Sequence, residues 1–244
     1  VGGLPDGVVD SGTLATDSVD SAELIDGAVD NSHLATGIDA TKLADGTVTS
    51  TELQYINTLS SNAQTQISAA GGGTTFLSSQ TASTSSTIDF ESLITTTYTH
   101  YIFIVSEVRM TTDGATMNIL FSDDNGSSYS GANYWYAGNG TDQDGTSRNI
   151  NSASASALIT STAVDQVDTH GYSGVFYLHS PLEGGNCTYM NFHLVYRDNT
   201  ATDRISLVGG GGYTQGFNVN AIRFVPSSST IIKGVFSMYG YNES

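Results

Sequence analysis

The chain has 244 residues, of which 38% are apolar and 9% aromatic, so it can bury a sizeable core and does not belong to the disordered class. Its 24 acidic residues against 7 basic ones give a net charge of −17, which repels phosphate backbones and anionic lipid surfaces. We therefore expect no nucleic acid partner and no membrane insertion. The longest apolar runs, such as 101–105, are also far shorter than the roughly 20 residues of a membrane span.

The first 50 residues contain a decapeptide repeat in five copies. In each copy an apolar anchor is followed five residues later by a leucine. The ten anchors are Val9, Leu14, Val19, Leu24, Val29, Leu34, Ile38, Leu43, Val48 and Leu53. An offset of five residues puts the two anchors of a copy on different faces of a regular strand or helix. Each copy is therefore expected to bend between its anchors.

Local signals indicate how the copies bend. Asp20 with Glu23, and Thr49 with Glu52, have the spacing of a capping box, which predicts that a helical turn begins at each pair. A copy of about ten residues cannot cover its own apolar side chains. We expect identical chains to wrap around a common axis, with the ten anchors at their interface. A solenoid made by a single chain is the alternative.

Residues 51–73 predict a short helical neck that ends in a glycine linker. Ser61 and Gln64 have the capping-box spacing that restarts a helix after a break, and three consecutive glycines end the segment. The predicted organisation is a repeat shaft over residues 1–50, the neck, and a separate head over residues 74–244.

The head sequence predicts a mainly β domain. Eight segments rich in β-branched and aromatic residues alternate with clusters of Gly, Asn, Asp and Ser. These segments are 100–110, 115–122, 132–138, 173–180, 187–197, 203–209, 220–227 and 230–241. No part of the chain after Gly73 has the pattern of a long helix. Eight or more strands predict an antiparallel β-sandwich, with a jelly roll as the first choice.

Residues 133–156 combine three consecutive aromatic residues with a long polar loop, a pattern typical of binding loops. In a strand, Tyr134 and Tyr136 face one way and Trp135 faces the other. We expect the tyrosines to face solvent and the tryptophan to lie in the core, because Trp is the larger apolar body and Tyr tolerates a wet tip. The expected receptor-binding residues are Tyr134, Tyr136, Asn139, Asp142 and Asp144.

Nothing in the sequence has the pattern of a catalytic, cofactor or metal site, so we expect a binding protein without enzyme activity, cofactor or metal. The four glycines at 209–212 lack the lysine and hydroxyl of a phosphate-binding loop and predict a mobile turn. The five histidines show no ligand spacing. Cys187 is expected to be a small, buried apolar residue.

Two other chemical hypotheses are open at this point. A glycan hydrolase needs two carboxylates that flank the scissile bond. The available carboxylates are Glu107, Asp124, Asp165, Asp168 and Glu183. Asp123, Asp124 and Asn125 offer oxygen atoms of the kind that Ca²⁺ prefers, but a β-hairpin turn at Asn125-Gly126 is the preferred interpretation of this stretch.

The decads, of the form V-[DT]-S-x-x-L, and the "ADGTVTSTELQYINTLSSNAQTQI" that follows them resemble the shaft and short coiled-coil neck of bacteriophage tail fibre proteins. "MNILFSDDNGSSY" and "NAIRFVPSSSTIIKGVFSMYGY" are similar to the globular domains at the ends of such fibres. The resemblance implies a homotrimer in a virion, which meets other virion proteins through its N-terminal end and a host surface glycan or protein through its head. A structural fibre or decoration protein without a receptor, and a tail-associated glycan hydrolase, are the alternatives.

Overall fold

The computed structural model describes Thr49, Thr51, Glu52 and residues 73–242, except 156, 160, 166–170, 184, 186 and 200–202. The chain divides into two units, Val1–Gln66 and Ile67–Ser244. The ten repeat anchors, the capping pair at Asp20 and the second helix of the neck lie outside the described residues.

The capping box predicted at Thr49 and Glu52 is confirmed. The amide nitrogen and the hydroxyl of Thr49 each donate to Glu52 Oε2 over 2.7 Å, and the Glu52 amide nitrogen donates to Thr49 Oγ1 over 3.2 Å. These bonds satisfy backbone N–H groups at the start of a helix. They also lower the pKa of the Glu52 carboxyl, with the bond from the Thr49 backbone as the largest cause. Thr51 and Glu52 are accordingly helical.

Among the described residues after Gly73 there are twelve strands and no helix. The strands are β1 (Thr75–Thr81), β2 (Ile88–Phe90), β3 (His100–Met110), β4 (Met117–Ser122), β5 (Tyr134–Asp142), β6 (Ile150–Ala155), β7 (Leu158–Ile159), β8 (Tyr172–His179), β9 (Thr188–Arg197), β10 (Arg204–Tyr213), β11 (Ala221–Pro226) and β12 (Ile231–Tyr241). Each of the eight segments predicted as strands overlaps one of them, so the mainly β fold is confirmed. No helix of the described residues is long and apolar enough to span a lipid bilayer.

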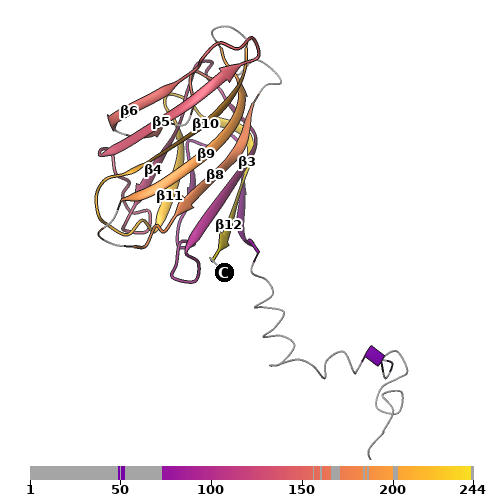
Figure 1. Ribbon diagram of the computed structural model, residues 1–244, viewed down its shortest axis with the longest axis vertical. Coiled ribbons are helices and arrows are strands. Elements are labelled where there is room, and N and C mark those ends of the chain that lie inside the picture. The colour runs from indigo at the N-terminus through magenta and orange to yellow at the C-terminus, as the bar shows by residue number, and fades with distance from the viewer. Residues whose placement is uncertain are drawn as a thin grey trace, which may run out of the picture. The chain divides into compact units, whose positions relative to one another are not determined.

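The strands form two antiparallel sheets. The larger has the order β1-β12-β3-β8-β9-β10-β5-β6, and the smaller has the order β2-β11-β4-β7. Figure 1 shows the larger sheet from its broad side, with β4 and β11 of the smaller sheet behind it. Pairing is nested, because β1 pairs with β12, β2 with β11, β3 with β12 and β8, and β4 with β11 and β7. Two hairpins, β9–β10 and β5–β6, extend the larger sheet beyond β8.

Aromatic side chains fill the space between the two sheets. Phe224 of β11 is fully buried. Its ring centroid lies 5.7, 5.5 and 5.2 Å from those of Phe103, Phe176 and Phe236, which belong to β3, β8 and β12 of the larger sheet. The two sheets therefore share one hydrophobic core.

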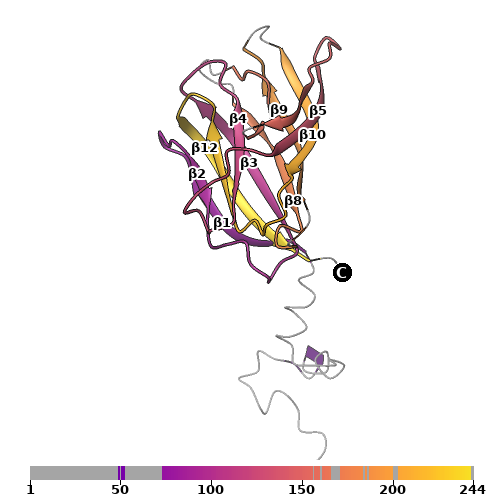
Figure 2. The same cartoon turned by 90° about the vertical axis from the view of Figure 1, so that its left-hand side faces the viewer.

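β1 begins and β12 ends at the same end of the larger sheet, because Thr75 pairs with Gly240. We call this end the base and the opposite end the tip; Figure 2 shows the C-terminus at the base. His179, at the end of β8, pairs with His100 and Tyr189, the first residue of β3 and the second of β9. The connection between β8 and β9 therefore lies at the base, whereas the turn between β5 and β6 lies at the tip.

The four glycines at 209–212 form part of β10, so the prediction of a mobile turn is wrong. A Cβ atom on Gly209 would lie 2.6 Å from Cζ of Phe192, and one on Gly212 would lie 2.4 Å from the carbonyl oxygen of Thr188. Glycine is required at these positions because neighbouring atoms occupy the space that a side chain would need.

The polar segment after β4 forms a tight turn, in which Asn125 and Gly126 have φ angles of 60° and 89°. The turn predicted at Asn-Gly is present, but it does not close a hairpin, because β4 and β5 belong to different sheets. The hydroxyls of Ser128 and Ser122 each donate to the Asp124 carboxylate over 2.7 Å, and bonds from these serines lower its pKa to about 2. Within the described residues, no three His, Cys, Asp or Glu side chains form a group that could hold a metal ion.

Replacing Tyr172 of β8 with phenylalanine should stabilise the domain by about 1 kcal/mol. Tyr172 is fully buried, and its hydroxyl has no hydrogen-bond partner among the described protein atoms, which costs roughly 1–3 kcal/mol. Burial also raises the pKa of this phenol. Denaturant unfolding measures the effect, with Tyr177→Phe as the control at a half-buried tyrosine of the same strand. A loss of stability in Tyr172→Phe would show that the hydroxyl is hydrogen bonded in solution.

Candidate functional site

The outer face of the larger sheet carries most of the exposed large apolar side chains of the described residues. These side chains are Phe76, Ile104, Tyr189, Val195, Val208, Ile232 and Val235. All except Ile232 occupy the outward positions of β1, β3, β9, β10 and β12, where they alternate with inward-facing residues. Exposed apolar side chains on one face make that face a candidate surface for a ligand or a partner.

Two rows of residues cross β8, β9, β10 and β5 near the base of this face. The outermost row is His179, Tyr189, Gly212 and Trp135, and the next is Tyr177, Asn191, Gly210 and Ala137. Neither row contains Asp, Glu, Lys or Arg, although the chain as a whole has a net charge of −17. The surface therefore offers aromatic rings, an amide and an imidazole without fixed charge.

Trp135 and Tyr189 form an edge-to-face aromatic pair across Gly212. Their ring centroids lie 6.2 Å apart, with an interplanar angle of 71°. A Cβ atom on Gly212 would lie 3.3 Å from the indole nitrogen of Trp135, so the missing side chain lets the indole lie close to β10. Tyr189 is 49% exposed and Trp135 is half-buried. The pair presents rigid ring surface at the base of the sheet.

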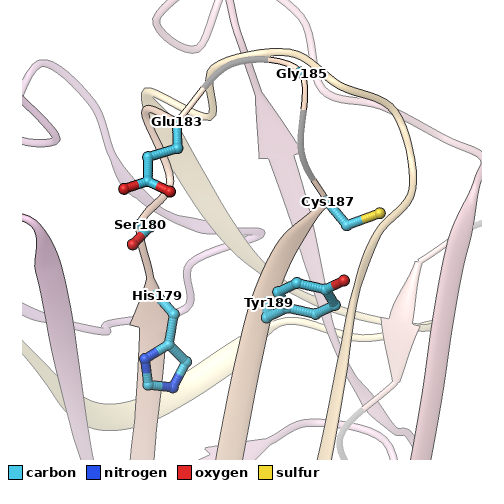
Figure 3. A pocket seen from close by; sticks show the side chains of 6 residues that line it. All are labelled: His179, Ser180, Glu183, Gly185, Cys187 and Tyr189. Carbon is cyan, nitrogen blue, oxygen red and sulfur yellow. The ribbon is translucent and has the colours of Figure 1, made fainter.

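A hollow of about 390 Å³ lies beside this pair, at the connection between β8 and β9. The described residues that line it are His179, Ser180, Glu183, Gly185, Cys187 and Tyr189. Figure 3 shows Ser180 and Glu183 on one side of the hollow, with Cys187 and Tyr189 on the other. The volume falls within the range of about 300–1,000 Å³ that small-molecule sites occupy. A second hollow of about 190 Å³ shares Ser180 and Glu183 as lining residues.

Imidazole and phenol rings pack against one another where the connection between β8 and β9 begins. The buried His100 stacks on Tyr241 with centroids 5.0 Å apart, and it meets His179 edge-on at 5.6 Å. The amide nitrogen of Ser180 donates to His100 Nδ1 over 3.4 Å. Ser180 has a φ angle of 41°, a left-handed conformation that costs a residue other than glycine about 1–3 kcal/mol. Strain of this kind tends to occur at functional sites.

The hollow is lined by side chains with hydrogen-bond donors and acceptors. His179 Nε2 and Asn191 Oδ1 are hydrogen bonded over 2.9 Å. A hydrogen bond with the Cys187 side chain raises the pKa of the Tyr189 hydroxyl. Cys187 is half-buried and lines the hollow, which corrects the prediction that it is a buried core residue. The Glu183 carboxylate is exposed and can accept.

β5 is oriented opposite to our prediction: the face with Tyr134 and Tyr136 packs in the core, and the face with Trp135 is on the outside. Tyr134 and Tyr136 are 0% and 9% exposed, and Trp135 lies on the outer face. The Tyr134 hydroxyl accepts from the Phe121 amide nitrogen over 2.7 Å and donates to the Ser130 carbonyl over 3.2 Å. Its hydroxyl thus has partners inside the core, and the expectation that the tyrosines face solvent while the tryptophan lies in the core is wrong.

The three polar residues predicted together with the tyrosines have different environments. Asn139 and Asp144 are exposed, whereas Asp142 is buried. Asp142 accepts from the Thr146 amide nitrogen over 2.8 Å and from Arg148 Nε over 3.1 Å. Burial opposes its ionisation, but these donors outweigh burial and lower its pKa. Asp142 therefore organises the turn at the tip, and none of the five predicted residues lines the hollow at the base.

The carboxylates considered for hydrolysis are distributed over the domain. Glu107 of β3 forms an ion pair with Lys233 of β12. Asp165 forms a second ion pair, in which its Oδ2 lies 2.9 Å from Arg197 Nε. Asp168 lies outside the described residues. Of the described residues that line either hollow, Glu183 is the only one with a carboxylate. A glycosidase of the ordinary kind needs two carboxyl groups about 5–9.5 Å apart.

The candidate site is therefore a hollow at the base, with an aromatic pair on one side and a single carboxylate on the other. Sequence reasoning missed its lining, although the alternation in "TYMNFHLV" places Tyr189 and Asn191 opposite three apolar residues and so indicates an exposed tyrosine. Comparisons of the chain with protein-family models, curated proteins and solved structures found no match.

Proposed function

We propose that the chain is a homotrimeric fibre protein of a bacteriophage virion, whose β domain attaches the particle to the surface of a host cell. The five decads, which resemble the shafts of phage tail fibres, support an elongated assembly of identical chains. Other virion proteins are the proposed partners of the N-terminal end, and a surface glycan is the proposed partner of the head.

We infer further that the head is a jelly roll to which two hairpins have been added. The nested pairing of β1 to β4 with β7, β8, β11 and β12 supports this, because a jelly roll folds two Greek keys into facing sheets. The added hairpins, β5–β6 and β9–β10, carry Trp135 and Tyr189. The candidate site would then lie on the part of the fold that can vary without disturbing the central strands.

The observation that carries the attachment role is the hollow beside Trp135 and Tyr189. Sugars offer hydroxyl groups to polar side chains and apolar ring faces to aromatic side chains, and this site holds both kinds of group on paired strands. A single shallow site binds weakly. Three heads on one shaft compensate for this, because linked sites raise the effective concentration of one another.

Light scattering on the full chain should give a mass near three times 25.5 kDa, because the anchor side chains of the repeats need partners. Changing Leu24 and Leu34 together to aspartate should dissociate the assembly and leave the β domain folded by circular dichroism. A stable monomer at micromolar concentration would contradict the proposed shaft.

Fluorescently labelled full chain should adsorb to cells of the host, and soluble surface polysaccharide from those cells should displace it. Labelled bovine serum albumin gives the background. A trimer that adsorbs to no host cell would contradict the attachment role and favour a structural or decoration protein of the virion. Release of new reducing ends from the polysaccharide would favour the hydrolase alternative.

A further inference from the structure

Glu183 places an unengaged carboxylate between the two hollows at the base. It lines both of them, and its side chain is exposed. No hydrogen bond or ion pair of this carboxylate occurs among the described residues, in contrast to the carboxylates of Asp89, Asp142 and Asp203, each of which is paired with an arginine. Figure 3 shows the Glu183 side chain across the hollow from Tyr189. It is available to a ligand as a hydrogen-bond acceptor.

Among the described residues, no lysine or arginine lines either hollow. The six basic side chains of the described residues lie elsewhere: Arg148 is held by Asp142 and Asp203, Arg197 by Asp165, Arg204 by Gln143, Arg223 by Asp89 and Lys233 by Glu107, and Arg109 lies on β3 opposite Lys233. The other titratable side chains that line the larger hollow are His179, on the same side as Glu183, and Cys187 and Tyr189 on the opposite side (Figure 3). Glu183 is the only carboxylate among the described residues that line the two hollows.

We propose that this hollow takes a neutral hexose residue and discriminates against the corresponding uronic acid. The proposal rests on the attachment role proposed above and names the class of sugar. Hydroxyl groups of a neutral sugar donate to the Glu183 carboxylate, while the Tyr189 ring contacts the apolar face of the sugar. A sugar carboxylate brings a like charge next to Glu183 and meets no cation that would offset it.

The test measures binding of the full chain to matched pairs of oligosaccharides that differ only at C6: galactose and galacturonic acid, glucose and glucuronic acid, and mannose and mannuronic acid. At pH 8 and low salt, a neutral oligosaccharide should bind at least about tenfold more tightly than its acidic counterpart. In 0.5 M salt this ratio should shrink, because salt screens charges at an exposed site.

Variants separate Glu183 from the charge of the whole chain. Glu183→Gln should bring the ratio of neutral to acidic binding close to one, and Glu183→Lys should invert it. Asp144→Asn removes one exposed carboxylate at the tip and should leave the ratio unchanged. Equal binding of both classes by the unaltered chain, or an unchanged ratio in Glu183→Gln, would overturn the inference while leaving the attachment role intact. If no oligosaccharide binds, the inference falls, and adsorption to host cells decides the attachment role separately.

Discussion

Replacing Phe224 with alanine should destabilise the β domain by roughly 3–5 kcal/mol, the usual cost of removing a fully buried phenylalanine. Phe224 is the largest side chain of β11 that faces the larger sheet, and its ring meets those of Phe103, Phe176 and Phe236. Its removal leaves a cavity at the point where the two sheets meet, and the surrounding rings can fill it only in part.

Urea unfolding of the full chain, followed by the fluorescence of the single tryptophan, measures this effect. The midpoint should fall while the slope stays constant, because the amount of surface exposed on unfolding is the same. Phe76→Ala is the matched control, since Phe76 is 57% exposed, and its cost should be below about 1 kcal/mol. Equal effects of the two changes would contradict a core shared by both sheets.

Trp135 and Tyr134 are neighbours on β5, and their replacement should have opposite consequences. Trp135→Ala should weaken ligand binding by tenfold or more and leave the domain folded, because the indole lies on the outer face beside Tyr189. Tyr134→Ala should destabilise the domain by roughly 3–5 kcal/mol, because it removes a fully buried ring and leaves the Phe121 amide without its partner.

The conservative change Tyr134→Phe distinguishes the ring from its hydroxyl. It keeps the buried volume but removes the acceptor for the Phe121 amide, so it should cost about 1–3 kcal/mol. Urea unfolding followed by circular dichroism gives these stabilities, because the Trp135→Ala variant lacks the single tryptophan of the chain. If Trp135→Ala unfolds the domain and Tyr134→Ala does not, the orientation of β5 described here is wrong.

Local patterns in the sequence predicted the secondary structure well where the strands are apolar. β3, β8, β9 and β12 contain long runs of β-branched and aromatic residues. The capping box at Thr49 was also predictable, since it depends only on residues three positions apart. β1 and β6 were not predicted, because "TFLSSQT" and "INSASA" have little apolar alternation and are held mainly by pairing with one neighbouring strand each.

The side of β5 that faces the core depends on partners distant in sequence. The alternation of Tyr134, Trp135 and Tyr136 was correctly predicted, but both faces of "YWYAGNGTD" are of similar polarity. Gly212 of β10 has no side chain that would crowd the indole of Trp135 on the outer face, and the Tyr134 hydroxyl has buried partners in Phe121 and Ser130. No signal within β5 carries that information.

The lining of the hollow was not predictable as a group for a related reason. Its residues come from the ends of two strands and their connection, and Trp135 joins them only through the pairing of β9 with β10 and of β10 with β5. The polar loop at residues 138–148 was a reasonable candidate by composition. Its buried carboxylate at Asp142 is instead engaged with Thr146 and Arg148, which gives that residue a structural role.

The claim that the head attaches to host cells through the base of β8 and β9 is tested most directly by measuring how three versions of the full chain adsorb to those cells. The unaltered chain should adsorb, the double variant Trp135→Ala with Tyr189→Ala should lose at least nine-tenths of the bound signal (a tenfold loss of affinity or more), and Phe76→Ala should adsorb like the unaltered chain. Phe76 is an exposed aromatic residue of the same face, on β1, and therefore controls for the loss of apolar surface. Undiminished adsorption by a folded double variant would contradict the assignment of the attachment site to the base of β8 and β9.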